Sequence, residues 1–317
     1  MTIKQKFFAD DGWAVWIDGD DLSTIYLDEW LNPKEKSYVD IAIHTRGIKG
    51  AKALNLYIPF SVSKEEVLDL SLLLQDKKIL YAKFNAACVI DYQKNDYTSE
   101  LAYHGKTLDV IHISKLGYTL EPLENGTLFR VDLDKVQEFL DNDEVYFLFR
   151  IPHKSLDQIF APQMDVKGLF QRLRNLITTP VKTEKYGYSM RINEIHLIPA
   201  RITRIGAFHR QRLKRAVISI SISDEYEVND QGCYRIKRLE EQLYQRYVPD
   251  EFSCENAITY QWEQDRGVNV RGHFNFYFSL ARNSVSPMSM VIYMILLVLV
   301  GSAGSALFEL IKLLVCG

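Results

Sequence analysis

The chain has 317 residues, of which 47% are hydrophobic and 25% are charged, and its formal net charge at pH 7 is −3. These values are ordinary for a soluble protein, and the length allows one large domain or two of average size. The four cysteines show no paired spacing, which excludes a disulfide framework and indicates a reducing compartment; they are Cys88, Cys233, Cys254 and Cys316.

The first 150 residues alternate apolar and polar positions in several segments, which predicts β-strands. The expected strands are Trp13–Ile17, Leu22–Leu27, Val39–His44, Lys52–Phe60, Lys77–Phe84, Thr107–Ile113, Thr127–Leu133 and Glu144–Ile151. The capping-box pattern at Ser63–Glu66 predicts a helix that runs to Gln75, and Asp134–Leu140 predicts a second, short helix.

From Asp165 to Thr178 the apolar residues recur at three- and four-residue steps with basic residues between them, which predicts an amphipathic basic helix. A helix at Ile236–Tyr247 is expected among four further strands: Arg191–Ile198, Arg215–Ile222, Ile258–Trp262 and Val268–Leu280. The predicted fold class is α+β: a strand-rich lobe at 1–160, the basic helix and linker at 161–185, a second strand-rich lobe at 186–286 and a transmembrane helix at 287–317.

Met288–Phe308 is an uncharged run of 21 residues. A helix of that length extends about 31 Å, which matches the hydrocarbon thickness of a bilayer. The N-terminus has no apolar segment of the kind found in signal peptides, and Arg271 and Arg282 precede the apolar run against Lys312 after it. We therefore expect a single-pass protein of the inner (cytoplasmic) membrane, with its soluble region in the cytoplasm.

Charge is distributed unevenly along the chain. Residues 1–150 hold 17 basic and 25 acidic residues, a net −8, whereas residues 167–215 hold 12 basic and two acidic residues, a net +10. Guanidinium groups bind phosphates and aromatic rings stack on bases, so this basic belt is a candidate site for a nucleotide or a short single-stranded oligonucleotide. Its candidate ligand-binding residues are Arg172, Arg174, Lys182, Lys185, Arg191, Arg201, Arg204, Arg210, Arg212, Lys214 and Arg215, with the aromatic residues Tyr186, Tyr188 and Phe208.

Two other interpretations of the basic belt stay open. It could lie on anionic lipid, where each basic charge contributes about 1 kcal/mol, or it could pair with the acidic first lobe as a structural seam. Along the C-terminal helix, Gly301, Gly304, Ser305, Glu309 and Lys312 fall on one face, and small residues such as the first three favour self-association. Glu309 then either forms a carboxylate ring at a pore or pairs with Lys312 at the membrane interface.

Motifs for catalysis or metal binding are weak. Glycine-rich nucleotide loops and paired metal-binding histidines are missing from the sequence, and no catalytic, metal-binding or cofactor-binding residue is predicted. The Asp18-Gly-Asp20-Asp21 sequence resembles the metal-binding strand end of PIN-like and NYN-type nucleases, although an Asp-Gly turn between two strands is the favoured interpretation. A membrane-tethered metal nuclease and a tail-anchored protein-binding scaffold are therefore kept as alternatives.

The basic belt, the Gly301–Ala306 small-residue run and the terminal apolar helix together resemble a membrane effector of bacterial anti-phage defence, in particular the Hailong-type channel effector. The resemblance implies a non-enzymatic homo-oligomer whose cytoplasmic region binds an oligonucleotide, made by a partner nucleotidyltransferase, and gates a transmembrane pore. No catalytic residue is implied by it.

Overall fold

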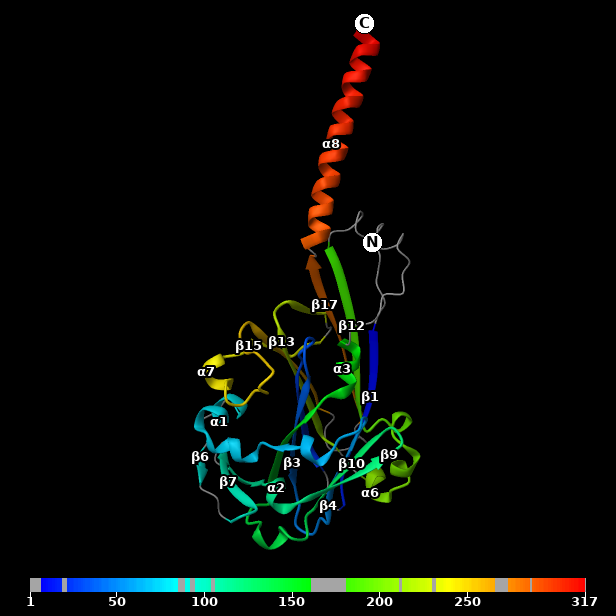
Figure 1. Cartoon of the computed structure of the whole chain (residues 1–317). Coiled ribbons are helices and arrows are strands. Elements are labelled where there is room, and N and C mark those ends of the chain that lie inside the picture. Colours follow the sequence, from blue (N-terminus) through cyan, green and yellow to red (C-terminus); the bar gives the residue numbers. More distant parts are fainter. Residues whose placement is uncertain are drawn as a thin grey trace.

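The computed structural model describes residues 7–18, 22–84, 89–91, 95–103, 106–160, 181–210, 213–229, 232–265, 273–285 and 287–316. Strands form a sandwich of two sheets, short helices lie around it, and one long helix leaves one end (Figure 1). The predicted strand-rich α+β class with a single C-terminal helix is confirmed.

The first sheet has seven strands in the order β14-β17-β12-β1-β4-β10-β9. Their bounds are β1 Phe7–Ile17, β4 Ala53–Ile58, β9 Tyr118–Leu123, β10 Gly126–Asp132, β12 Val181–Ile192, β14 Tyr226–Asn229 and β17 Phe274–Val285. The strands β12 and β17 pair over their whole length, from Val181 opposite Val285 to Ile192 opposite Phe274, and together they reach toward the long helix.

The second sheet has ten strands: nine lie in the order β15-β16-β13-β2-β3-β11-β8-β7-β6, and β5 pairs with β11. Their bounds are β2 Leu22–Trp30, β3 Tyr38–Arg46, β5 Leu68–Asp69, β6 Val89–Asp91, β7 Thr98–Tyr103, β8 Lys106–Ile111, β11 Glu144–Pro152, β13 Arg215–Ser223, β15 Arg235–Arg238 and β16 Ala257–Asp265.

Both sheets combine strands from the two halves of the chain. β1 pairs in parallel with β12, and β2 pairs in parallel with β13. The predicted ranges 1–160 and 186–286 therefore each contribute strands to both sheets, and the boundary near residue 160 does not divide one sheet from the other.

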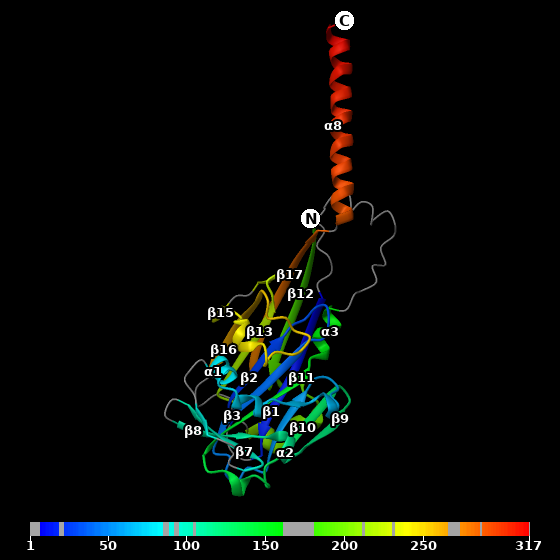
Figure 2. The same cartoon turned by 60° about the vertical axis from the view of Figure 1, so that its left-hand side comes forward.

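The core lies between the two sheets (Figure 2). Successive residues of a strand point to opposite faces, so every second residue of the central strands enters this layer. Phe129 of the seven-stranded sheet stacks on Phe149 of the ten-stranded sheet with ring centroids 4.7 Å apart, and Trp262 stacks on Phe278 at 5.9 Å. Each such buried side chain stabilises the fold by about 1.5–3 kcal/mol relative to exposure, which makes this layer the main source of stability.

Short helices pack around the sandwich. Their bounds are η1 Lys64–Glu66, η2 Ser71–Gln75, α1 Lys77–Phe84, α2 Ile113–Leu116, η3 Gln137–Phe139, α3 Lys154–Phe160, η4 Ile195–Leu197, α5 Ala200–Thr203, α6 Gly206–Arg210 and α7 Glu241–Tyr244. Ile202 and Phe208, of α5 and α6, pack on Trp16 over the seven-stranded sheet. Helices α1 and α7 lie over the ten-stranded sheet, where Ile79 and Tyr244 belong to one buried apolar cluster.

Several predicted elements differ from the structure. Lys77–Phe84 is wrong as a strand: it is the helix α1, because Ile79 and Leu80 are adjacent and both buried, as one face of a helix allows. The strand predicted at Arg191–Ile198 ends at Ile192, and the helix predicted at Ile236–Tyr247 is a strand followed by α7. The helix expected to reach Gln75 is two 3-10 turns separated by β5, and the basic helix at 165–178 lies outside the described residues.

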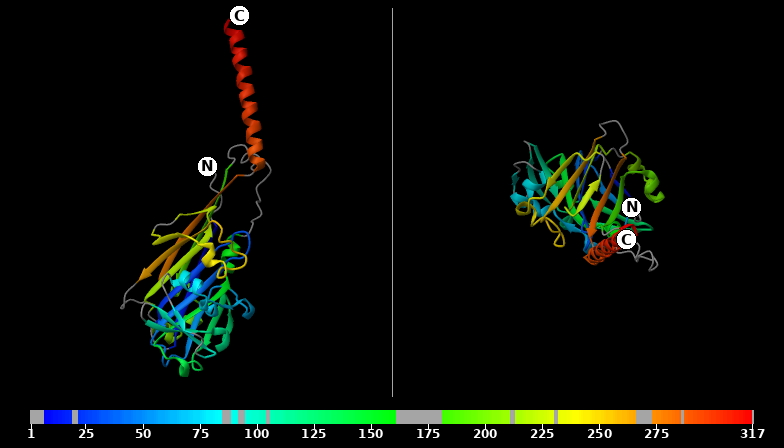
Figure 3. Two further views of the ribbon diagram at one scale, coloured as in Figure 1. Left: turned by 90° about the vertical axis from the view of Figure 1, so that its left-hand side faces the viewer. Right: turned by 90° about the horizontal axis from the view of Figure 1, so that it is seen from above.

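The C-terminal helix α8 spans Pro287–Cys316. Its segment Met290–Phe308 has a mean hydropathy of 2.3, and none of it is buried against the rest of the chain, so α8 is long and apolar enough to cross a membrane. β17 ends at Val285, so a single residue separates the sandwich from this helix (Figure 3, left).

Candidate functional site

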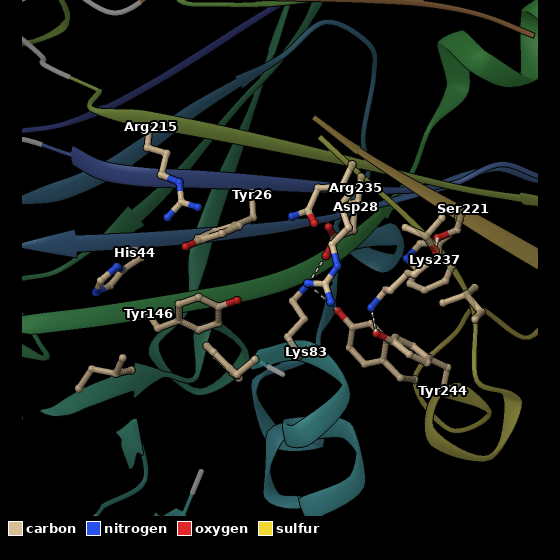
Figure 4. Close-up of a pocket in the computed structure, with 18 residues that line it drawn as sticks. Tyr26, Asp28, His44, Lys83, Tyr146, Arg215, Ser221, Arg235, Lys237 and Tyr244 are labelled. Carbon is tan, nitrogen blue, oxygen red and sulfur yellow. Dashed lines mark hydrogen bonds and ion pairs between the residues drawn. The ribbon is translucent and has the colours of Figure 1, made fainter. Parts of the chain in front are cut away.

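A cavity of about 310 Å³ lies on the outer face of the ten-stranded sheet, under α1 and the segment around α7 (Figure 4). Its floor follows from strand alternation, because the residues that flank each core position point outward. The residues that form the floor are Tyr26, Asp28 and Trp30 of β2, His44 of β3, Tyr146 of β11, Arg215, Ser219 and Ser221 of β13, and Thr259 and Gln261 of β16. This cavity is called the cleft below.

The cleft carries a surplus of positive charge. Four basic side chains line it, against one acidic side chain among the described residues, Asp28; the four are Lys83, Arg215, Arg235 and Lys237. Tyr26, Tyr146, Tyr244 and Tyr247 line it as well. Basic groups bind phosphate or carboxylate, and aromatic faces stack on planar rings. This combination suits an anionic ligand that contains a ring.

The centre of the cleft is an ion pair between two elements. Lys83 of α1 donates to the Asp28 carboxylate and, at 3.2 Å, to the Tyr247 hydroxyl. Burial alone lowers the pKa of Lys83, but attraction to Asp28 outweighs it, and the pKa is raised. Lys83 is therefore charged and neutralises Asp28, so the centre of the cleft adds no net charge.

The edge strand β15 contributes two basic residues to one side of the cleft: Arg235, which lies in the same row across the sheet as Asp28, and Lys237, two residues farther along the strand. Register places Arg235 opposite Gln261, and Lys237 opposite Thr259. Lys237 donates to the Tyr244 hydroxyl at 2.7 Å and lies 5.1 Å from the centre of that ring, which fixes a cation beside an aromatic face. Arg235 forms no ion pair with any described acidic residue, so its guanidinium can accept a ligand anion.

Arg215 and His44 lie at one end of the cleft (Figure 4). Arg215 Nη2 pairs with Glu263 at 2.7 Å, while its buried Nε has no hydrogen-bond partner in the described part of the chain. His44 Nε2 lies 2.9 Å from Glu144, and burial, opposed by that carboxylate, lowers the His44 pKa. A buried donor without a partner costs free energy, so the Arg215 Nε reduces the stability of the fold.

A buried ion pair supports the floor beneath α7. Arg150 donates to both oxygens of Asp40, at 2.6 and 3.0 Å, and the Trp30 indole donates to the same carboxylate at 2.9 Å. Arg150 also donates to the backbone carbonyl of Tyr247 at 2.6 Å, which ties the segment after α7 to the sheet. The wall of the cleft is thus attached to its floor through charged hydrogen bonds.

The structure separates most residues of the predicted basic belt. Tyr188 is in the core, Phe208 packs on Trp16, and Tyr186 donates to Glu184 at 3.1 Å. Arg201 pairs with Glu121, and Arg204 is exposed at the end of α5. These residues lie on the seven-stranded sheet or its outer face, away from the cleft.

Arg215 is the belt residue that lines the cleft. Lys185 is exposed on β12, and Arg191 and Lys214 are half-buried. Lys182 lies on β12 and Arg210 on α6, while Arg172, Arg174 and Arg212 are outside the described residues. The sequence analysis missed Lys83, Arg235, Lys237 and the tyrosines of the cleft, because they come from segments far apart in the chain and no local pattern joins them.

The predicted face of the membrane helix is part of α8. Gly301, Gly304 and Ser305 are exposed along it, and Glu309 lies on the same helix. Beyond the adjoining backbone of α8, no described atom lies within 4 Å of the position that a Cβ of either glycine would take. Ser305 donates its hydroxyl to the Gly301 carbonyl at 3.1 Å, so the hydroxyl is satisfied within its own helix, as a bilayer requires.

The alternative metal site is only partly within the described residues. Asp18 lies 3.3 Å from Arg130, whereas Asp20 and Asp21 are outside the described residues. β1 and β2, the strands on either side, belong to different sheets. The residues that the structure describes contain no group of three or more histidine, cysteine, aspartate or glutamate side chains placed to hold a metal ion.

Known protein-family models and curated protein sequences gave no match to this chain.

Proposed function

We propose that this protein is a membrane-anchored ligand sensor of bacterial anti-phage defence, without catalysis of its own. In this proposal α8 crosses the inner membrane, the sandwich lies in the cytoplasm, and a nucleotide or short oligonucleotide binds in the cleft. The α8 helices of several copies associate through the face that contains Gly301 and Gly304 and form a pore. The nucleotide, supplied by a partner nucleotidyltransferase, shifts this pore between closed and open arrangements.

The observation that carries the proposal is the connection between the sandwich and α8. An exposed apolar helix follows β17 after one residue, and β17 pairs with β12 along its whole length. A link of one residue cannot absorb a movement of the sheet, so a change in the sandwich reaches the membrane segment. A helix that only anchored the protein would work equally well on a long linker.

The cleft supports the ligand part of the proposal. It is of the size of small-molecule sites, it has three more basic than acidic side chains, and aromatic rings line it. A ligand that binds one state of the oligomer more tightly than the other changes their populations, and a nearly complete switch needs a difference of about 5.5 kcal/mol. Several charged hydrogen bonds, each of about 1.5–3 kcal/mol, are sufficient for this.

Reconstituted vesicles test the proposal directly. The full chain is placed in anionic vesicles, and dye release is measured with and without added adenine nucleotides. We expect release to differ at least about tenfold between the two conditions, since each 1.4 kcal/mol of differential binding gives a factor of ten. The double variant Gly301→Leu and Gly304→Leu should insert normally and release no dye, because the bulky side chains keep the helices apart.

Ala303→Leu is the matched control. At 100° per residue, Ala303 lies on the face of α8 opposite Gly301, so this variant should behave like the unmodified chain. Absence of dye release in both conditions would contradict the pore, and equal release in both conditions would contradict gating. Protease digestion of the sandwich in inverted but not in right-side-out vesicles from cells checks the proposed orientation.

A further inference from the structure

Both sheets end on the same side of the sandwich in a short edge strand. β14 ends the seven-stranded sheet and β15 ends the ten-stranded sheet, so each has one edge without a partner strand among the described residues. The two strands next to them face each other across the core, because Trp262 of β16 stacks on Phe278 of β17. Open strand edges of this kind are able to pair with a strand of another chain.

The two edges carry opposite charges on their outer faces and apolar side chains on their inner faces. Glu227 of β14 is exposed and alternates with Val228, which packs against the core. On β15, Lys237 points outward into the cleft, whereas Tyr234 and Ile236 are 72% and 62% exposed although strand alternation directs them toward the inner face. Large exposed apolar side chains at an open edge indicate a surface that another strand covers.

The free edge of β15 also has backbone groups available. The Leu239 N–H donates to the Ala257 carbonyl of β16 at 3.0 Å. In an antiparallel ladder every second residue bonds to the same neighbour, so Lys237 and Arg235 also bond to β16. The N–H and C=O groups of Ile236 therefore point away from β16, toward the open edge.

The course of the chain fixes the directions of these strands. β16 pairs antiparallel with β13, and β13 passes through a two-residue turn into β14, which pairs antiparallel with β17. β13 and β17 therefore run toward α8, while β14 and β16 run away from it (Figure 1). β15 pairs antiparallel with β16, so β15 runs toward α8, opposite to β14.

The register places β14 and β15 at the same height along the sandwich. Counting from the stacked Trp262 and Phe278 toward α8, the next residue of β16 pairs with Arg235, and the next residue of β17 pairs with Asn229. Arg235 begins β15 and Asn229 ends β14, and each strand has four residues. The two edge strands therefore span the same range of heights, one in each sheet.

We propose that this side of the sandwich binds a second copy of the chain about a two-fold axis parallel to the strands. Rotation about that axis places β14 of each copy antiparallel to β15 of the other at an unchanged height. Glu227 then faces Lys237 of the second copy, and Val228 faces Ile236 of the second copy. The seven-stranded sheet of each copy continues into the ten-stranded sheet of the other, which makes the interface isologous.

Charge and direction select this partner. Pairing β15 with another β15 would oppose basic residues with basic residues, and pairing β14 with another β14 would bring two Glu227 carboxylates near each other; like charges directly opposite destabilise a sheet. A two-fold axis parallel to the strands leaves the direction of β17 unchanged, so both copies of α8 leave the dimer at the same end, as insertion into one bilayer requires. The interface depends on the sheet edges alone and requires neither the proposed nucleotide nor the pore.

Disulfide trapping of the full chain in cell membranes tests the interface. The variant with Glu227→Cys and Lys237→Cys should form a covalent dimer under mild oxidation, because opposite Cα atoms of paired strands lie about 4.5–5.5 Å apart, within reach of a disulfide. Within one copy these positions belong to different sheets, which pack about 10 Å apart, so the bond must join two copies. Each single variant measures the background from the native cysteines. Thr119→Cys with Lys237→Cys is the matched control, since Thr119 is exposed on β9, the opposite edge of the seven-stranded sheet.

Charge reversal tests the choice of partner in a chain whose α8 association is blocked. In the Gly301→Leu and Gly304→Leu background, light scattering in detergent should still detect a dimer. Adding Glu227→Lys should raise the dimer dissociation constant about tenfold, since each dimer contains this contact twice. Adding Lys237→Glu as well should restore the dimer, which a damaged fold would not do. Glu121→Lys, on the edge strand β9, should leave the dimer unchanged.

Three results would overturn the interface: no covalent dimer from the double cysteine variant, an equal yield from the Thr119→Cys control, or a dimer unaffected by Glu227→Lys. None of them would contradict the proposed pore, because the cysteine variants keep the face of α8 that contains Gly301 and Gly304 intact. A dimer that persists in the Gly301→Leu and Gly304→Leu chain, while that chain releases no dye, would support this interface separately from the association of α8.

Discussion

Asp28 and Glu29 are neighbours on β2, yet they lie in opposite environments. Strand alternation directs Asp28 outward into the cleft, where it binds Lys83, and directs Glu29 inward to the layer between the sheets. Glu29 is fully buried, and neither of its carboxylate oxygens has a hydrogen-bond partner among the described residues. One strand therefore carries a paired carboxylate on its outer face and an unpaired one on its inner face.

The surroundings of Glu29 are polar but contain no permanent cation among the described groups around it. His153 Nε2 lies 3.5 Å from Glu29 Oε1, 3.7 Å from Asp11 Oδ2 and 3.0 Å from the Tyr188 hydroxyl. Burial, strengthened by repulsion from Asp11, raises the pKa of Glu29, and burial lowers the pKa of His153 to about 3. Burial therefore favours the neutral forms of Glu29 and His153, whereas the outer carboxylate of Asp28 is paired with the cation Lys83.

The proposed ligand site lies on the outer face because that face carries the surplus of positive charge. Its basic groups outnumber its acidic groups, so they can attract an anion from solution. Glu29 and His153 on the inner face are fully buried from solvent. The predictions below separate the two faces by their response to mutation and to pH.

Arg150→Ala, a change on the outer face of the ten-stranded sheet, is expected to have the largest effect on folding free energy. This change leaves Asp40 buried without its cation, and breaking such a pair from one side costs about 3–5 kcal/mol of folding free energy. Chemical unfolding of the full chain in detergent measures it. The double variant Arg150→Met and Asp40→Leu removes both charges and should recover most of the loss. A loss below about 1 kcal/mol in the single variant would show that Asp40 has another stabilising partner.

The inner face should respond to acid through His153. Its pKa is about 3 in the folded chain and close to 6.5 when unfolded, so between these values the unfolded state binds more protons. Folding stability contributed by neutral His153 is present above about pH 6.5 and falls by about 1.4 kcal/mol for each pH unit below it. His153→Phe should reduce this slope, as measured by unfolding at pH 4 to 7. An unchanged slope would place the acid sensitivity elsewhere.

Glu29 should make stability depend on pH in the opposite direction to His153. Because its folded pKa is raised, the folded state holds a proton that the unfolded state releases above its ordinary pKa, and stability falls as pH rises toward the folded pKa. Glu29→Gln should remove this dependence and stabilise the chain at pH 8, because the amide is neutral in both the folded and the unfolded state. Asp28→Asn is the matched comparison on the other face, and it should destabilise the chain because Lys83 loses its partner.

Parts of this organisation were accessible from the sequence. Val39–His44 and Lys52–Phe60 were predicted as strands because alternation is a local signal, and the apolar helix was predicted because its composition is local as well. The cleft was not predicted. Lys83, Arg215 and Arg235 meet only after the parallel pairing of β2 with β13 and the docking of α1, and this long-range register has no local signal in the sequence.

The basic belt shows that residues close together in the sequence can also be separated by the fold. Its residues are close in sequence, but β12 belongs to the seven-stranded sheet and β13 to the ten-stranded sheet, so the fold separates them. Tyr188 follows strand alternation into the core, where its hydroxyl donates to Asp11 at 3.1 Å. Glu29 and Asp28 differ by one position, and only knowledge of which face is buried assigns them different roles.

A change at the connection between the two sheets should have the smallest effect on stability and the most specific effect on function. β13 forms part of the cleft floor and continues through Glu225 to β14, which pairs with β17 next to α8. Arg282 of β17 donates to Glu225 at 2.8 Å and lies 5.3 Å from the centre of the Tyr226 ring. This contact joins the cleft floor to β17, the strand that precedes α8.

Arg282→Gln should therefore leave nucleotide affinity unchanged and reduce the ligand-dependent change in dye release from vesicles. Its effect on folding should stay below about 1 kcal/mol, since Glu225 is half exposed and surface ion pairs contribute little. Arg201→Gln removes a surface ion pair of the same kind on the far side of the seven-stranded sheet, and it should change neither measurement. If Arg282→Gln weakened nucleotide binding as well, the contact would support the cleft itself. An unaltered response to nucleotide would mean that the cleft reaches α8 by a route other than β14.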